Sequence, residues 1–386
     1  MNKYFSRKGR GVLIVALACI LILGACSHPE PIRIGFSGQL TGKQSDLGVQ
    51  GRNGVQMAVD EINAAGGIAG RPVELLVQDD LGTPEGARAA DRALIEANVV
   101  AIIGHMTSSQ TMAALEVVEK AGIPLISPTT STTALDHLND HFFRVIPSNA
   151  TEGKLLARRA WKRHITRIVI VYDHDNAPFG QALAEAFTQE YQSLGGEVVA
   201  LVPFSSSQEP NMNMLASQLQ ATGAEGVFII ASANDTALIA QHIRINGWSV
   251  PLFISGWAHT NTLIQIGGRA VEGAELITHF DIDTQTQPYR EFVACYQKRF
   301  GQPPTFAAIQ SYEAMMVLAQ ALEKVETQGL NLSQALVSTR DFPGLTGPIT
   351  LNQYGNGVRP HYLIAVQGGK FITITRLESE EIETEN

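Results

Sequence analysis

The chain has 386 residues, of which 45% are hydrophobic and 17% are charged, so it is long and apolar enough to bury the cores of two globular domains. Its formal net charge is −9, and this becomes −13 if residues 1–25, which hold four basic and no acidic residues, are removed. A surplus of carboxylates argues against nucleic acid as a partner and against a polybasic membrane patch.

The first 25 residues have the pattern of a secretory signal peptide. Four basic residues precede the apolar run 12–23, and Leu23-Gly24-Ala25-Cys26 follows as a small-residue cleavage site. The run has about 12 residues, too few to span the ~30 Å of a bilayer core. The cysteine after the small residues resembles the lipobox of bacterial lipoproteins. This resemblance implies removal of 1–25, a lipid on Cys26 and an extracytoplasmic protein held to the membrane by that lipid.

Cysteine use excludes an intramolecular disulfide in the processed chain. Of the three cysteines, Cys19 lies in the signal peptide and Cys26 carries the lipid, which leaves Cys295. Cys295 stands among apolar residues in a helical pattern, so we expect it to be a small buried side chain.

Strand and helix patterns alternate along the first part of the chain. Apolar, β-branched runs bounded by glycine or polar residues predict strands, and helical spacing of apolar residues predicts helices between them. The expected strands are 32–36, 73–77, 99–103 and 123–126, with helices at 49–63, 84–97 and 110–121. Such alternation indicates βαβ units and a parallel sheet covered on both faces.

A second alternating series begins after a short strand that ends near Pro147. Its expected strands are 165–172, 198–202, 226–230 and 251–254, and its helices are 178–194, 210–222 and 234–246. An extended segment at 274–280 crosses back, two long helices follow at 289–300 and 306–325, and we expect a third crossing at 349–355. A closing hairpin, 362–366 with 371–375, precedes an acidic tail.

The expected fold class is therefore α/β, with two Rossmann-like parallel-sheet lobes joined by three crossovers. The first lobe comprises 31–147 plus 278–348, the second comprises 148–277 plus 349–376, and 377–386 is a tail. Two lobes joined in this way can open and close about a hinge, and the crevice between them is a preferred binding site for a ligand.

The residues 99–131 carry the strongest sign of a binding site. Hydroxyl clusters follow the strands 99–103 and 123–126, and the first cluster also begins a helix. Carboxyl ends of parallel strands face the crevice, and a helix N-terminus attracts anions through its unpaired N–H groups. These hydroxyls also have a purely structural explanation, in which Ser108 caps the helix and the second cluster is a Ser/Thr-rich turn. Because two clusters converge on one edge, ligand binding explains them about as well.

No catalytic constellation is present in the sequence: there is no nucleophile elbow, P-loop, paired-histidine metalloprotease motif or Cys-x-x-Cys. We therefore expect neither an enzyme nor a cofactor. His137 and His141 would share a helical face with Asp136 and Asp140, which we interpret as a solvated polar face and not a metal site. His105 is expected to be a structural histidine.

Several motifs resemble those of the type I periplasmic binding proteins, in the branch that binds leucine, isoleucine and valine. They are 34–36, 51–55, the run Asn63-Ala64-Ala65-Gly66-Gly67-Ile68-Ala69-Gly70, the pair Gly104-His105 with Ser108-Ser109, and 123–128. The similarity extends from about residue 32 to 375. It implies two lobes that close on a small molecule, which is then passed to the permease subunits of an ABC importer.

The same resemblance implies roles for individual residues. Ser108 would bind the ligand carboxylate, and Thr129 and Ser131 would add backbone and hydroxyl contacts. Phe179 would cover the ligand from the second lobe, and Leu47 would lie near the aromatic wall of the first.

One segment departs from the family pattern. The amino-acid binders have an acidic residue after the strand equivalent to 252–254, whereas residues 255–259 contain no carboxylate. We therefore expect an anionic or amide head at the hydroxyls and an apolar body packed on Phe179 and Trp257. Asp173, Asp175 or Asp235 could supply the missing charge from another loop. The ligand class stays open among amino acids, amides and aliphatic or aromatic carboxylates.

Two functions fit these observations. The leading hypothesis is a lipid-anchored solute receptor for an importer, and the alternative is a ligand-sensing or regulatory lipoprotein that acts on a protein partner. Fold alone does not separate them.

Overall fold

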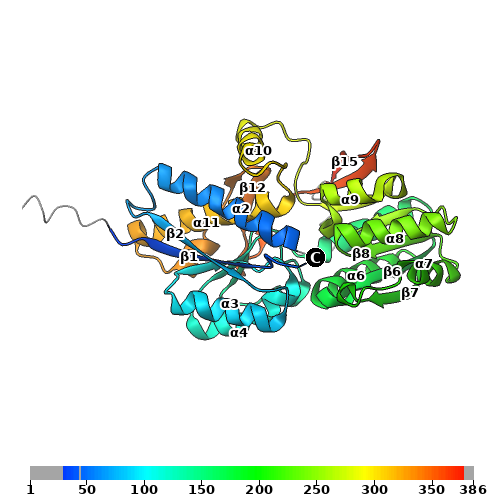
Figure 1. The fold of residues 1–386 in the computed structure, drawn as a ribbon, viewed down its shortest axis with the longest axis horizontal. Helices are drawn as coiled ribbons and strands as arrows, with labels where there is room; N and C mark the ends of the chain where they lie inside the picture. Colours follow the sequence, from blue (N-terminus) through cyan, green and yellow to red (C-terminus); the bar gives the residue numbers. More distant parts are fainter. Residues whose placement is uncertain (1–28, 43–44, 378–386) are drawn as a thin grey trace, which may run out of the picture.

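The computed structural model describes residues 29–42 and 45–377, which form two α/β lobes side by side (Figure 1). The signal peptide, Cys26 and residues 378–386 of the acidic tail lie outside the described residues. Within the described ranges, no helix is long and apolar enough to cross a bilayer.

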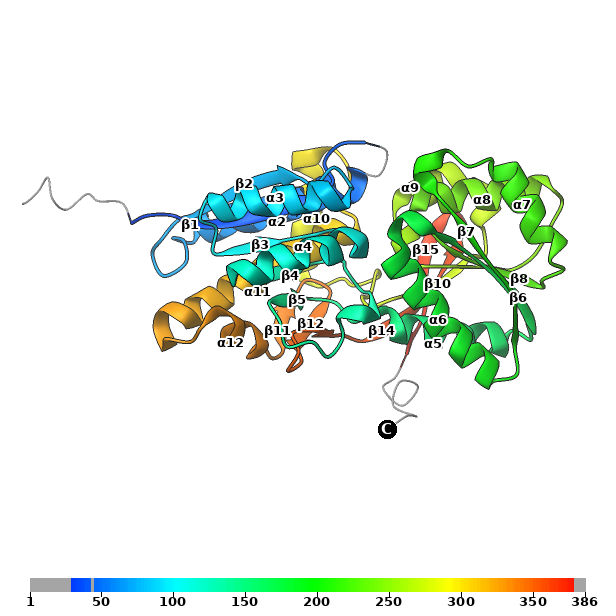
Figure 2. The same cartoon turned by 90° about the horizontal axis from the view of Figure 1, so that it is seen from below.

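The first lobe is built on a five-stranded parallel sheet in the order β2-β1-β3-β4-β5 (Figure 2). Its strands are short and rich in isoleucine and valine, and the central three are almost wholly buried. Their bounds are β1 Ile32–Gly38, β2 Val73–Asp79, β3 Ala101–Ile103, β4 Leu125–Ser127 and β5 Phe142–Arg144.

Helices cover both faces of this sheet, as alternating strands and helices require. α3 (Pro84–Glu96) and α4 (Ser108–Ala121) bury Leu94 and Val118 against one face. The other face is covered by α2 (Ser45–Ala64), α10 (Gln287–Phe300), α11 (Phe306–Gln328) and α12 (Leu332–Val337). Three of these four helices return to the first lobe after the chain has built most of the second.

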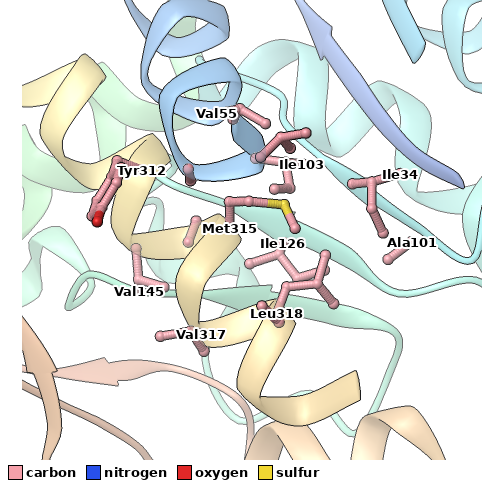
Figure 3. Packing of buried hydrophobic residues seen from close by; sticks show 14 of the residues in the cluster. Ile34, Val55, Ala101, Ile103, Ile126, Val145, Tyr312, Met315, Val317 and Leu318 are labelled. Carbon is pink, nitrogen blue, oxygen red and sulfur yellow. The ribbon is translucent and has the colours of Figure 1, made fainter. Parts of the chain in front are cut away.

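The largest core of the first lobe lies between α2, α11 and the sheet (Figure 3). Met315 and Leu318 of α11 are fully buried in the same cluster as Ile103 and Ile126 of the sheet. α2 approaches α11 closely because Gly54 has no side chain: a Cβ there would lie 2.0 Å from the Ala308 carbonyl oxygen.

The second lobe contains a seven-stranded sheet in the order β15-β14-β10-β9-β8-β6-β7. The last two strands in sequence form the predicted antiparallel hairpin across Gly368-Gly369, and the other five are parallel. The bounds are β6 Arg167–Asp173, β7 Glu197–Phe204, β8 Gly226–Ile230, β9 Leu252–Ile254, β10 Glu275–Thr278, β14 His361–Gln367 and β15 Lys370–Leu377.

Side chains of β6 alternate between two cores, as the two-residue period of a strand requires. Ile168 and Ile170 face the core formed with α5 (Asn149–Lys162) and α6 (Ala177–Ser193). Val169 and Val171 face the core formed with the helices of the opposite face, α7 (Met212–Ala221), α8 (Ala233–Ile245) and α9 (Asn261–Gly267).

The third crossing occurs later than we expected. Ile349 and Leu351, placed in the second lobe by the sequence, are fully buried in the core of the first. They lie on β12 (Gly347–Leu351), which forms a small sheet with β11 (Phe342–Gly344) and β13 (Gly357–Val358). Residues 349–358 therefore belong with the first lobe, and the chain crosses between Val358 and His361.

Two local expectations are also wrong. Cys295 is exposed, because Phe292 and Tyr296, four residues apart, occupy the buried stripe of α10 and Cys295 lies off it. Residues 136–141 do not form a helix, so their histidines and aspartates share no helical face.

Candidate ligand-binding site

A cavity of about 60 Å³ lies between the lobes, and all six residues predicted to contact a ligand line it. They come from both lobes: Leu47, Ser108, Thr129 and Ser131 from the first, and Phe179 and Trp257 from the second. The cavity has room for a small solute and none for a macromolecule. The roles assigned to the six residues in binding remain predictions.

Ser108 is the first residue of α4, and the extended residue before it, Thr107, is the N-cap. Ser108 therefore does not cap the helix, which was the purely structural explanation of its hydroxyl. Its side chain is 2% exposed and lines the cavity, and no hydrogen bond among the described residues engages its hydroxyl. A hydroxyl and the positive end of a helix dipole thus converge on one wall of the cavity.

The loop after β4 supplies the neighbouring wall. The Thr129 hydroxyl donates to the Met106 carbonyl oxygen at 2.7 Å, which leaves this side chain engaged within the protein. Ser131 lines the cavity, and its carbonyl oxygen accepts from the backbone N–H of Asn149 at 2.7 Å. The same loop is held from below by the buried guanidinium of Arg144, whose Nη1 donates to the Thr132 carbonyl at 3.0 Å.

Two aromatic side chains form the wall on the second lobe. The rings of Phe179, on α6, and Trp257, in the 3₁₀ turn Gly256–Ala258, meet edge to face with centroids 5.7 Å apart. Both rings line the cavity, so an apolar body entering from the mouth meets an aromatic surface.

Sequence reasoning missed Glu152, a carboxylate in the first turn of α5 that lines the same cavity. Its Oε1 accepts the backbone N–H of Gly256 at 2.8 Å, and burial raises its pKa to about 7. In the sequence, Glu152 could have been found by its position shortly after the first crossing between the lobes, where α5 begins. The second lobe therefore does present an acidic group, from a different element than the family pattern suggested.

None of the three aspartates considered from the sequence lines this cavity. Asp173 is buried at the end of β6, where its carboxylate accepts a hydrogen bond from the Ser206 hydroxyl at 2.7 Å. Asp175 and Asp235 line an open groove at the mouth of the crevice, together with Asp46 and Glu209.

The base of the cavity is formed by chain segments that cross between the lobes. His279 follows β10, His361 begins β14, and Gln310 comes from α11. Burial, with Arg359 nearby, holds the pKa of His279 well below its usual value, and burial lowers that of His361 to about 4. Both imidazoles are neutral near pH 7, in agreement with the Gln310 Nε2 that lies 2.6 Å from His279 Nε2 and donates to it.

Hydrogen bonds join the lobes at the sides of the cavity. From α4, the Ser109 hydroxyl donates to the Asp175 carbonyl at 3.0 Å and the Ser109 N–H to Asn176 Oδ1 at 3.1 Å. The Thr132 hydroxyl donates to the Pro178 carbonyl at 2.8 Å. These contacts close the cavity at its edges.

His105 lies outside the cavity and has a structural environment, as expected. It is fully buried, with its Nδ1 2.8 Å from Asp80 Oδ2 and its Nε2 3.2 Å from Asp91 Oδ1. Among the residues that the structure describes, no group of three or more histidine, cysteine or acidic side chains is placed to hold a metal ion.

Comparisons with known proteins agree with this architecture. A family model described as periplasmic binding protein matches residues 31–370. An amino acid binding protein of Pseudomonas aeruginosa is 28% identical over 324 residues, which cover 83% of this chain and 85% of the relative.

Solved structures share the fold over nearly the whole chain. A leucine-binding protein from Thermotoga maritima superposes with a TM-score of 0.82 at 24% identity, over 91% of this chain and 99% of that one. A solute-binding protein from R. palustris, solved with benzoate, gives a TM-score of 0.80 at 20% identity, over 90% and 96%. The fold is thus that of the type I periplasmic binding proteins. Because the family model covers most of the sequence, the chain belongs to the periplasmic binding protein family, whose members bind solutes and are not enzymes.

Proposed function

We propose that this chain is a lipid-anchored, extracytoplasmic receptor that closes on a small organic solute and delivers it to an ABC importer. The observation that supports the proposal is a cavity between the lobes that is lined by residues of both, among them the six predicted from the sequence to contact a ligand. The solute classes that we consider are amino acids, amides and aliphatic or aromatic carboxylates. Relatives whose names or structure titles mention amino acids, leucine or benzoate support the amino acids and the aromatic carboxylates.

Hinge closure fits the contacts at the edges of the cavity. Ser109 and Thr132 of the first lobe donate to backbone carbonyls of the second, and such bonds form only when the lobes approach. A ligand that bridges Ser108 and the Phe179–Trp257 wall adds contacts to the closed state alone, so it shifts the population toward closure.

The test has two stages. A thermal-shift screen of small carboxylates, amides and amino acids identifies a ligand, since a solute bound to the folded state alone raises the unfolding temperature. X-ray scattering with and without that ligand then measures compaction. Uptake of the labelled ligand in a strain lacking this protein tests delivery, and intact uptake in that strain would favour the sensing role instead.

A further inference from the structure

The cavity between the lobes contains one carboxyl side chain among the described residues, that of Glu152. The Gly256 N–H is the group that hydrogen-bonds this carboxyl, and it engages Oε1 alone. A Cβ on Gly256 would lie 3.6 Å from Oε1 and 3.7 Å from Oε2, so both oxygens face the turn that carries Trp257. Oε2 has no hydrogen-bond donor from the described part of the chain.

Of the described residues that line the cavity, none is a lysine or arginine, so none offers this carboxylate a positive counter-charge there. The two histidines of the cavity, His279 and His361, have lowered pKa values and are neutral at physiological pH. Burial accordingly raises the pKa of Glu152 to about 7, because nothing compensates the desolvated charge except one backbone N–H.

Three arginines at and after the C-terminal half of α5 pair with carboxylates other than Glu152. Arg158 of α5 pairs with Glu190 of α6 at 2.6 Å. Arg159 and Arg163 pair with Glu275 of β10 at 2.8 and 3.3 Å. The titration of Glu152 is therefore governed by burial and by what occupies the cavity.

Burying an unpaired carboxylate costs several kcal/mol, so a closed lobe pair needs either a proton on Glu152 or a cation beside it. Resting on the proposed function, we infer that the bound solute carries a protonated amine that pairs with Glu152, while its anionic or amide end lies at Ser108. The ligand class is thereby narrowed to amine-bearing small acids and amides, and simple carboxylates such as benzoate are poor ligands.

The charge at the mouth of the crevice is negative, which is the sign that attracts a protonated amine. Among the residues that the structure describes, the groove outside the cavity is lined by the carboxylates of Asp46, Asp175 and Asp235 and by no lysine or arginine. A groove lined by one sign of charge concentrates ligands of the opposite sign and disfavours free anions. This field favours a zwitterion or a cation over a lone carboxylate.

The competing explanation is a protonated Glu152 that donates a hydrogen bond to a ligand carbonyl. The two models predict opposite pH dependence. An amine needs ionised Glu152, so its affinity rises as pH increases from 6 to 8 through a pKa of about 7. A carbonyl acceptor needs the protonated form, so its affinity falls over the same range.

The test is calorimetry at pH 6 and pH 8 with matched probes: leucine against 4-methylpentanoate, phenylalanine against 3-phenylpropanoate, and leucinamide. We expect the wild-type protein to prefer an amine-bearing probe at least tenfold over its deamino partner. Glu152→Gln keeps the shape and removes the charge, so it should lower affinity for the amine about 10- to 100-fold and leave the deamino acid unchanged.

Glu116→Gln is the matched control, since it also removes one carboxylate, and Glu116 is an exposed residue of α4 that lines neither the cavity nor the groove at its mouth. It should keep the preference for the amine. Binding of a deamino acid or benzoate with no preference for the amine, or an amine preference that survives Glu152→Gln, overturns the inference and leaves the proposed function intact. Failure of every probe in the panel and in the wider screen contradicts both.

Discussion

Arg359 and Glu313 form a doubly hydrogen-bonded ion pair in which each side chain is only 1% exposed. Arg359 Nη1 donates to Oε2 at 2.8 Å and Nη2 to Oε1 at 3.1 Å. Glu313 lies on α11 of the first lobe, and Arg359 lies in the last crossing, between β13 and β14. The pair therefore attaches one crossing segment to the first lobe, directly behind the base of the cavity.

Replacing one partner of this pair should strongly destabilise the protein. Glu313→Gln leaves the Arg359 guanidinium buried without its carboxylate, for which we expect a loss of about 3–5 kcal/mol in urea unfolding. Glu116→Gln, which breaks the exposed pair with Lys120, is the control and should cost at most about 1 kcal/mol. Equal effects of the two changes would mean that water reaches the Arg359 pair.

Ser108 should contribute to affinity through a hydrogen bond to a charged group. Such bonds are worth roughly 1.5–3 kcal/mol, so Ser108→Ala should weaken binding of a screened ligand about 10- to 100-fold. Ser193→Ala, whose hydroxyl donates to the Glu190 carbonyl far from the cavity, serves as control in the same calorimetry. A change below about twofold for Ser108→Ala would remove this residue from the site.

Trp257 should report ligand entry by its fluorescence. Its indole lines the cavity, whereas Trp248 packs on the hydrophobic core of the second lobe and Trp161 packs beside α6. A bound ligand should shift or quench emission in the wild type and in Trp248→Phe, and Trp257→Phe should lose the response. Retention of the full signal in Trp257→Phe would place the responding tryptophan elsewhere.

His105 should make stability fall at alkaline pH. Burial alone would lower its pKa, but the carboxylates of Asp91 and Asp80 outweigh that effect and raise it to about 10. The folded state then holds a proton that the unfolded state, with a pKa near 6.5, has released. The contribution is full below pH 6.5 and is lost as pH rises through about 10, with a slope of at most about 1.4 kcal/mol per pH unit.

Denaturant unfolding between pH 7 and pH 10 measures this slope. His105→Gln should be less stable at pH 7 and should show a flatter profile, since it has no proton to lose. A wild-type profile that is equally flat would show that His105 is neutral in the folded state.

Cys26 should carry the lipid. Cys26→Ala should abolish labelling by a fatty-acid probe and should release the protein from the membrane fraction, because in our proposal the lipid on Cys26 holds it there. Unchanged labelling of this variant would refute the assignment, and Cys295→Ala, which changes an exposed cysteine of α10, is the control.

Local patterns determined most of the architecture. β-Branched runs predicted the strands of both sheets, and helical spacing predicted eight of the helices to within a few residues, because each strand or amphipathic helix carries its own period. The sequence analysis predicted no helix at α5, α9 or α12. The position of Ser108, Thr129 and Ser131 also followed from sequence, since parallel strands bring their carboxyl ends to one edge.

What only the tertiary structure decided was the partner of each apolar or charged residue. Ile349 and Leu351 alternate as a strand of either lobe would, and packing against α11 and its neighbours placed them in the first. Cys295 sits among apolar residues, but the stripe that is buried depends on where α10 docks. Glu152 is an ordinary first-turn carboxylate by sequence, favoured there by the helix dipole. Its place in the cavity arises because the turn at Gly256, 104 residues away in the chain, folds back against it.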